Sequence, residues 1–190
     1  MVDENKSVLD LVKEFAKYST GAERSNDLIF NVERILGRKL NKDEEFKLRI
    51  NIEIFISSII VYTIASLDIE ENKKIFFVSQ YREETNKIFQ IFVGWSVDRI
   101  EDHTNLLNIA TSLYSRWFKN VKGISTQKDY EKLWDDFTDF IIGNLNFGPQ
   151  ITSENKKQYN LLSKIIKSKL AALTYDVKKK IQEDIGLFLE

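Results

Sequence analysis

The chain has 190 residues, of which 43% are hydrophobic and 30% are charged, and its formal net charge at pH 7 is −1. These proportions are typical of a globular protein with an apolar core, and the length fits a single domain over residues 1–190. The absence of cysteine excludes disulfide bonds, thiolate metal sites and cysteine nucleophiles.

The N-terminal segment and the longest uncharged run both bear on localisation. Residues 1–6 are mostly polar and lack the basic and apolar regions of a secretory signal. The uncharged run from Ile54 to Leu67 would span about 21 Å as a helix, which is less than the roughly 30 Å of a bilayer core. We therefore expect a cytoplasmic protein with no membrane partner, in which this run is buried.

The first third of the chain shows the apolar spacing of amphipathic helices. One stripe comprises Val8, Leu11, Val12, Phe15 and Ala16, and a second comprises Leu28, Ile29, Val32, Ile35 and Leu36. Such spacing places the apolar residues on one face of a helix. Gly37 stands where a C-terminal cap is expected, and Asn41 with Glu44 forms the pattern of a capping box that opens the next helix.

Within residues 47–56, polar and apolar side chains alternate from Lys47 to Ile54, which is the pattern of a β-strand. Their β-branched isoleucines also favour a strand. However, neither glycine nor proline occurs between Gly37 and Gly94, so the chain offers no residue suited to a hairpin turn there. We therefore predict a helix over residues 42–68, at the centre of a compact all-α bundle of six to eight helices.

Further apolar segments follow this central helix. Residues 75–93 carry apolar side chains on more than one face, which is typical of a helix buried in a core or in an oligomer interface. Two more amphipathic stripes predict helices over residues 106–121 and 130–141. The buried face of the second is expected to carry Tyr130, Leu133, Trp134, Phe137, Phe140 and Ile141. A loop containing Gly148 and Pro149 is predicted for residues 143–152.

The C-terminal part of the chain predicts one long helix. Apolar residues recur in steps of three and four up to residue 188, so the helix covers about residues 153–188. A continuous helix of this length would measure about 54 Å, whereas a domain of this size has a diameter of roughly 40–45 Å. Either the helix breaks near residues 174–176, or the segment 153–190 is an interface element that packs against a second subunit in a homodimer.

The run Asp135-Asp136-Phe137-Thr138-Asp139 is the sharpest candidate for chemistry. Its spacing is similar to the acidic motif of all-α isoprenoid synthases, in which carboxylates one turn apart bind magnesium ions that bridge a diphosphate. On a helix, Asp135, Asp136 and Asp139 lie within about 100° of arc, opposite the apolar stripe. This placement predicts a solvated acidic face. A Mg²⁺ and phosphate site is the alternative, and only this alternative implies a cofactor.

The strongest charge asymmetry lies in the predicted C-terminal helix. Eight lysines and a single acid, Asp176, occur between Lys156 and Lys180. Lys157, Lys164, Lys167 and Lys178 cluster on the side of the helix away from its apolar stripe. A basic stripe of this kind is expected to solvate the helix or to bind an anion or a partner. It contains no arginine for bidentate phosphate or base contacts, so nucleic acid is weakly supported.

Two classes of function follow from these patterns. The sequence has no glycine-rich phosphate loop and no nucleophile motif, and its single histidine, His103, cannot form a multi-histidine metal site. We therefore predict a non-enzymatic interaction or regulatory protein, such as an antagonist, an immunity-type protein or an assembly factor, that binds a protein partner through its surface. The alternative is a small helical enzyme or ligand-binding module that uses Asp135, Asp136 and Asp139 to hold a divalent metal and phosphate.

Overall fold

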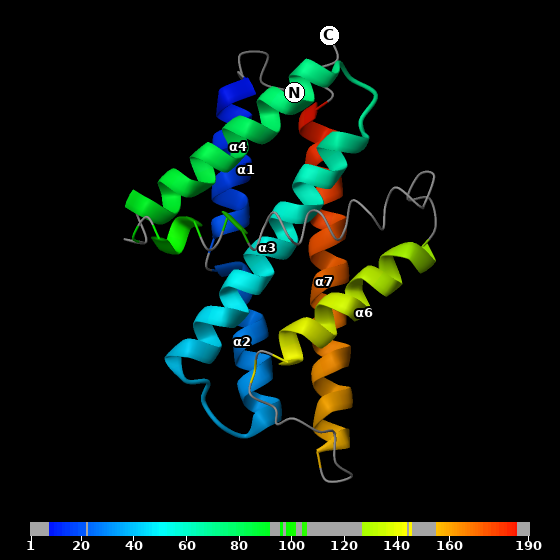
Figure 1. Ribbon diagram of the computed structural model, residues 1–190. Helices are drawn as coiled ribbons and strands as arrows, with labels where there is room; N and C mark the ends of the chain where they lie inside the picture. Colours follow the sequence, from blue (N-terminus) through cyan, green and yellow to red (C-terminus); the bar gives the residue numbers. More distant parts are fainter. Residues whose placement is uncertain are drawn as a thin grey trace. The chain divides into compact units, whose positions relative to one another are not determined.

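The computed structural model describes residues 8–21, 23–91, 96, 98–101, 104–105, 127–143, 145 and 155–185. Within these residues there is no strand, and the helices with defined bounds (Figure 1) are α1 (Val8–Thr20), α2 (Glu23–Leu36), α3 (Lys42–Ser66), α4 (Glu71–Ile91), α6 (Gln127–Gly143) and α7 (Lys156–Ile185). The all-α prediction is confirmed, and α3 is the predicted central helix. The helix predicted over residues 106–121 and most of the predicted loop 143–152 lie outside the described residues.

The junction between α2 and α3 has the caps that the sequence predicts. Gly37 follows α2 with a φ of 67°, a left-handed conformation that glycine adopts without a Cβ clash. Asn41 Oδ1 accepts a hydrogen bond of 2.9 Å from the Glu44 amide, and Glu44 Oε2 accepts one of 3.0 Å from the Asn41 amide. This reciprocal pair is a capping box, so that prediction is also confirmed.

Burial around α3 explains why the alternating residues 47–56 form a helix. Every residue from Asn51 to Val61 is buried, including the polar Glu53 and Ser57, so this part of α3 is covered on all sides and shows no amphipathic period. Within the described residues, α3 is also the one helix with the length and composition to cross a membrane, and 72% of its apolar stretch is buried.

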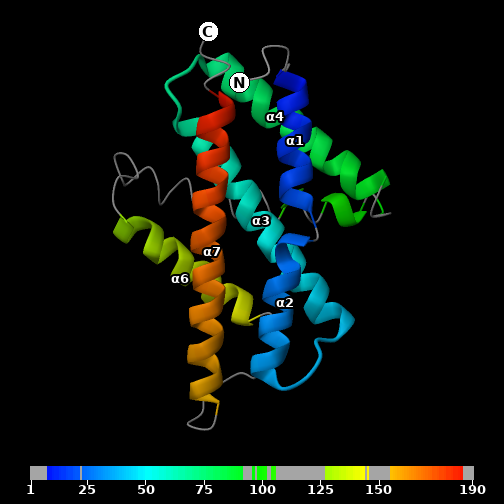
Figure 2. The same cartoon turned by 180° about the vertical axis from the view of Figure 1, so that it is seen from behind.

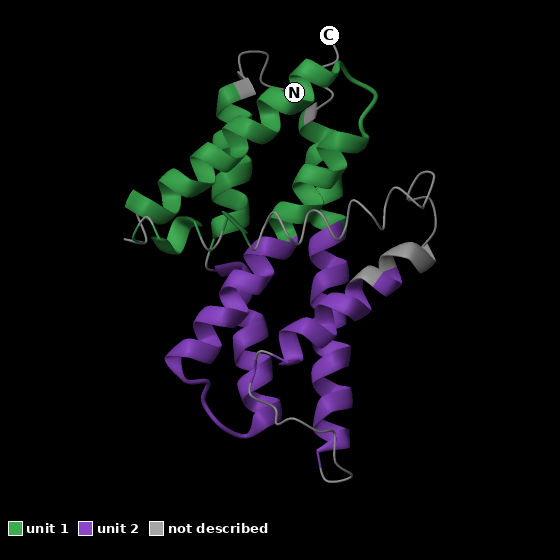
Figure 3. Ribbon diagram, in the orientation of Figure 1, with its two compact units in different colours: residues 1–21, 56–123, 175–190 green, residues 22–55, 124–174 purple. Residues whose placement is uncertain are grey.

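The chain divides into two compact units (Figure 3). Unit 1 comprises residues 1–21, 56–123 and 175–190, and unit 2 comprises residues 22–55 and 124–174. Helices α3 and α7 contribute residues to both units. Because this division runs through two continuous helices, the single domain over residues 1–190 stays a prediction.

Unit 1 is built on the contact between α1 and α4, which lie side by side in both views (Figures 1 and 2). The rings of Phe15 and Phe77 meet edge to face with centroids 6.0 Å apart. Ser57 of α3 and Tyr81 of α4, both fully buried, share a hydrogen bond of 2.6 Å between their hydroxyl groups. These contacts join three helices through one apolar core with a satisfied polar pair at its centre.

A lysine from α7 completes unit 1. Lys180 Nζ donates to Glu14 of α1, lies 3.2 Å from Asp184, and sits 5.6 Å from the ring centroid of Phe15. Burial lowers the pKa of Lys180, but the hydrogen bonds from its ammonium to Glu14 and Asp184 outweigh burial and raise that pKa overall. The charge is therefore retained beside the core.

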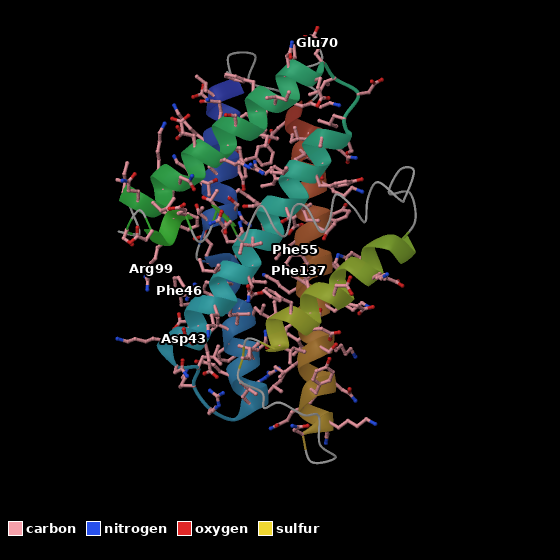
Figure 4. All side chains as sticks on the ribbon, in the orientation of Figure 1. Asp43, Phe46, Phe55, Glu70, Arg99 and Phe137 are labelled. Atoms are coloured by element: carbon pink, nitrogen blue, oxygen red, sulfur yellow. The ribbon has the colours of Figure 1, made fainter. Side chains whose placement is uncertain are left out.

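Unit 2 brings α6 against α3 and α7. The rings of Phe55 and Phe137, labelled in Figure 4, meet edge to face with centroids 4.9 Å apart. Trp134 Nε1 donates a hydrogen bond of 3.1 Å to Thr174 Oγ1. One residue corrects the predicted stripe of α6: Phe140 is 52% exposed, although its spacing places it on the apolar side.

Helix α7 runs through residues 174–176 without a break, so the alternative of a broken helix is wrong. The chain has neither glycine nor proline between Pro149 and Gly186, so this stretch lacks the residues that usually break a helix. Thr174 is buried and uses its hydroxyl in two hydrogen bonds. Its Oγ1 donates to the Leu170 carbonyl at 2.8 Å and accepts from Trp134. Within the helix, both the donor and the acceptor of the Thr174 hydroxyl are therefore hydrogen-bonded, although threonine otherwise favours helix ends.

Candidate partner-binding surface

Helix α7 has a buried apolar side and a basic side at its N-terminal end. Leu162, Ile166 and Leu170 are fully buried. On the opposite side, five of the described residues line a shallow hollow of about 490 Å³, and we call them the basic patch: Lys156, Lys157, Asn160, Leu161 and Lys164. Their spacing along the chain places all five within about 140° of helix arc. The basic patch lies entirely within unit 2.

The three lysines of the basic patch are exposed, and none has an ion pair with the described residues. The first turn of α7 contains no acidic residue. Because the amide groups at the start of a helix carry a partial positive charge, a cation there costs about 0.3–1 kcal/mol and an anion is stabilised. Lys156 and Lys157 therefore oppose the stability of the helix that carries them, and their charges are available to an external anion.

Other lysines of α7 are used inside the units. Lys167 forms an ion pair of 2.7 Å with Asp135 of α6, and Lys169 forms one of 2.9 Å with Asp27 of α2. These two lysines flank the buried side of the helix, where carboxylates of neighbouring helices can reach them. The lysines of α7 therefore fall into two groups: Lys167 and Lys169 connect helices through ion pairs, and the lysines of the basic patch face solvent.

The predicted basic stripe is therefore divided by the structure. Lys157 and Lys164 lie in the basic patch together with Lys156, which the sequence reasoning did not select. Lys167 is engaged by Asp135. Lys178 is half-buried, has contacts of its own and belongs to unit 1. Binding of an anion or a partner by any of them stays a prediction.

The acidic motif lies on α6, with Asp135, Asp136 and Asp139 all exposed. Asp135 is bound to Lys167, and Asp139 Oδ1 accepts a hydrogen bond of 2.7 Å from the Tyr159 hydroxyl. This hydrogen bond to a carboxylate, together with burial, raises the pKa of Tyr159 to about 12. Two of the three carboxylates thus connect α6 to α7.

These contacts bear on the metal hypothesis. A cation at the motif would have to displace Lys167 from Asp135 and Tyr159 from Asp139. Within the described residues, no three acidic or histidine side chains come together as a metal-binding group. The Mg²⁺ site stays a prediction, with no contact in the described residues that favours it, and His103 lies outside the described residues.

Two exposed apolar residues were missed by the sequence reasoning. Leu161, 44% exposed, lies in the basic patch, and Phe30, 61% exposed, lines a second hollow of about 430 Å³ with Arg34 at the end of α2. Each adjoins a regular apolar stripe without belonging to it. The sequence signal for such a residue was an apolar side chain outside the 3.6-residue period of its helix, which predicts an exposed apolar position.

Comparison of the chain with protein-family models, curated proteins and solved structures finds no match. A function can therefore be inferred only from the geometry of the described residues.

Proposed function

We propose that this protein is a non-enzymatic regulatory protein, of the antagonist, immunity or assembly-factor kind, that binds an acidic surface of a protein partner through the basic patch. One observation carries the proposal. Lys156, Lys157 and Lys164 surround the exposed side chain of Leu161 and have no ion pair with the described residues. An apolar centre with a charged rim is the usual anatomy of a protein–protein contact.

The chemistry of the basic patch favours a protein over a nucleic acid. Its cations are lysines, which act as point charges and lack the bidentate geometry of arginine. Among the described residues, no aromatic side chain lines the hollow, so these residues offer no stacking platform for bases. Leu161 instead requires an apolar group from the partner, which a phosphate backbone does not present.

Electrostatics also determine how the partner is expected to bind. Charges separated by more than about 8 Å are largely screened at physiological salt, so three neighbouring lysines act together only on a nearby anionic surface. Such patches increase the association rate more than the final affinity. Binding through the basic patch should therefore weaken as salt rises, while the contact to Leu161 is insensitive to salt.

The test compares two triple variants with the same total charge. K156E/K157E/K164E reverses the basic patch, and K13E/K42E/K73E reverses three exposed lysines elsewhere that form no ion pair within the described part of the chain. Since each reversal subtracts two charges, both variants change the net charge from −1 to −7. Any difference in binding between the two variants therefore depends on where the charges are placed and not on how many are changed.

Each form serves as bait in a lysate of the source cells, and captured proteins are identified by mass spectrometry and then purified. We expect an acidic protein whose capture is lost with K156E/K157E/K164E and kept with K13E/K42E/K73E. Its Kd should rise about tenfold with the first variant, and also when salt is raised from about 50 to about 200 mM. Equal capture by all three baits, or capture of nuclease-sensitive material only, would contradict the proposal.

A second variant separates the two parts of the contact. Leu161→Asn removes the exposed apolar centre and leaves all three lysines in place. We expect weaker binding with an unchanged salt dependence, because the lost contact is apolar. A change in the salt slope without a change in affinity would show that Leu161 is not part of the contact.

A further inference from the structure

A groove in unit 1 lies between the end of α3 and one face of α4. Its volume is about 480 Å³, and Val61 and Ala65 of α3 line it together with Ile75 and Val78 of α4. The α4 residues follow the spacing of a single helix face. Ile75 is 60% exposed, so it projects from the surface, whereas the small side chain of Ala65 leaves a hollow beside it.

The two ends of this groove carry opposite charges. Glu71 stands at the start of α4 with a side chain 75% exposed, and its nearest cation is Lys74 at 3.4 Å. Arg82 stands at the other end, is half-buried, and forms no ion pair within the part of the chain that the structure describes. The groove therefore presents a carboxylate at one end and a guanidinium at the other.

We propose that this groove binds the same groove of a second copy of the chain, with the two α4 helices antiparallel about a two-fold axis. In that arrangement Glu71 faces the partner's Arg82, and Ile75 faces the partner's Val78 at the centre of the interface. The same contacts occur twice, as in any two-fold interface.

Sequence positions explain why a second copy fits better than an unrelated helix. The midpoint between Ile75 and Val78 is also the midpoint between Glu71 and Arg82. An antiparallel copy therefore aligns both apolar contacts and both opposite charges in one register. The charges are separated by eleven helical residues, about 16 Å, so both pairs lie at the edges of the apolar centre. This surface gives the predicted homodimer a specific location, and it does not involve the basic patch.

The first experiment tests self-association at an exposed position. Sedimentation velocity of the whole chain should show a dimer at tens of micromolar. Ile75→Glu should raise the dimer dissociation constant about tenfold or more, because it places a charge in the apolar centre. Ile91→Glu is the matched control, since Ile91 is 68% exposed and lies on the opposite side of α4. Far-UV circular dichroism checks that both variants remain helical.

The second experiment tests the register by exchanging charges. Glu71→Arg places a second guanidinium opposite the partner's Arg82, and Arg82→Glu places two glutamates opposite each other, so each variant alone should be mainly monomeric. An equimolar mixture of E71R and R82E should form a dimer, because both charged pairs of the mixed interface are then attractive. In one pair the two substituted residues meet with their charges exchanged, and in the other the original Arg82 of the E71R chain meets the original Glu71 of the R82E chain. Recovery on mixing requires two chains that face each other through these residues.

Three results would overturn the proposal. The wild-type chain could sediment as a pure monomer at tens of micromolar. Glu71→Arg, an exposed change with little effect on folding, could leave a wild-type dimer intact. The mixed variants could remain monomeric although each is folded, which would exclude the antiparallel register. A dimer that dissociates with Ile75→Glu and re-forms on mixing E71R with R82E would support it.

Discussion

Replacing Glu44 by alanine tests how much the junction between α2 and α3 contributes to stability. The Glu44 side chain is 1% exposed, and its carboxylate accepts hydrogen bonds from Arg38 at 2.7 and 2.8 Å and from the Asn41 amide at 3.0 Å. Loss of the cap costs about 1 kcal/mol. Loss of the ion pair adds about 1 kcal/mol, since Arg38 is 46% exposed and solvent screens the pair.

We therefore expect Glu44→Ala to lower the free energy of unfolding by about 2 kcal/mol, which corresponds to a fall in Tm of roughly 4–8 °C for a protein of this size. Urea denaturation followed by circular dichroism measures the first quantity, and a thermal scan measures the second. Glu45→Ala is the matched control in the same turn. Its carboxylate is 42% exposed and pairs with Arg49, so we expect a loss below about 0.5 kcal/mol.

The effect should also depend on pH. The hydrogen bond from Arg38 lowers the pKa of Glu44 below its ordinary value of 4.5, and the Asn41 amide acts in the same direction. A carboxylate with a depressed pKa stabilises the fold above its unfolded pKa, and this contribution is lost as pH falls through the folded pKa. The difference in the free energy of unfolding between wild type and Glu44→Ala should therefore be largest at neutral pH and should decrease below pH 4.5. The reasoning would be refuted if this difference did not depend on pH, or if Glu45→Ala lowered the free energy of unfolding as much as Glu44→Ala.

Three further predictions concern single groups. Tyr81→Phe should lower the free energy of unfolding by about 1–2 kcal/mol in urea melts, because it removes the buried hydrogen bond between the Tyr81 and Ser57 hydroxyl groups. Gly37→Ala should cost about 1 kcal/mol at a φ of 67°, and Gly37→Asn should cost less, as chemical denaturation can compare. Asp139→Asn should lower the pKa of Tyr159 from about 12 towards 10 in an ultraviolet titration of tyrosinate; an unchanged titration would contradict the contact.

Local patterns predicted much of the fold because they depend on residues within one or two turns. The stripe from Leu11 to Ala16 is buried in α1 as its spacing requires. Asn41 and Glu44, three positions apart, form the capping box that their types indicate. The strand pattern at residues 47–56 was correctly rejected because no turn residue lies near enough to pair a second strand.

Long-range packing could not be predicted in the same way. The spacing of Phe140 assigns it to the apolar side of α6, but it is exposed, because burial at the lateral edge of an apolar stripe depends on what the neighbouring helices cover. The hydroxyl of Thr174 in α7 accepts a hydrogen bond from Trp134, forty residues earlier in the chain. Neither outcome is encoded in a local period.

The candidate site shows the same division between local and distant information. The sequence located an excess of lysines on α7 and an acidic motif on α6. It could not show that Lys167 forms an ion pair with Asp135, or that the Tyr159 hydroxyl donates a hydrogen bond to Asp139. Pairing between charges on different helices depends on helix packing, so the lysines of the basic patch could be identified only once the engaged ones were known.

The start of α7 is a locally frustrated helix end, because cations stand where the backbone dipole favours anions. A carboxylate-rich partner on the basic patch would supply the negative charge that the first turn lacks, so the proposed binding and helix stability would be linked quantities. Such a partner would raise the melting temperature of the chain as well as cover its surface. A substitution that repairs this helix end from within, such as Lys156→Asp, would make the protein more stable and a poorer binder.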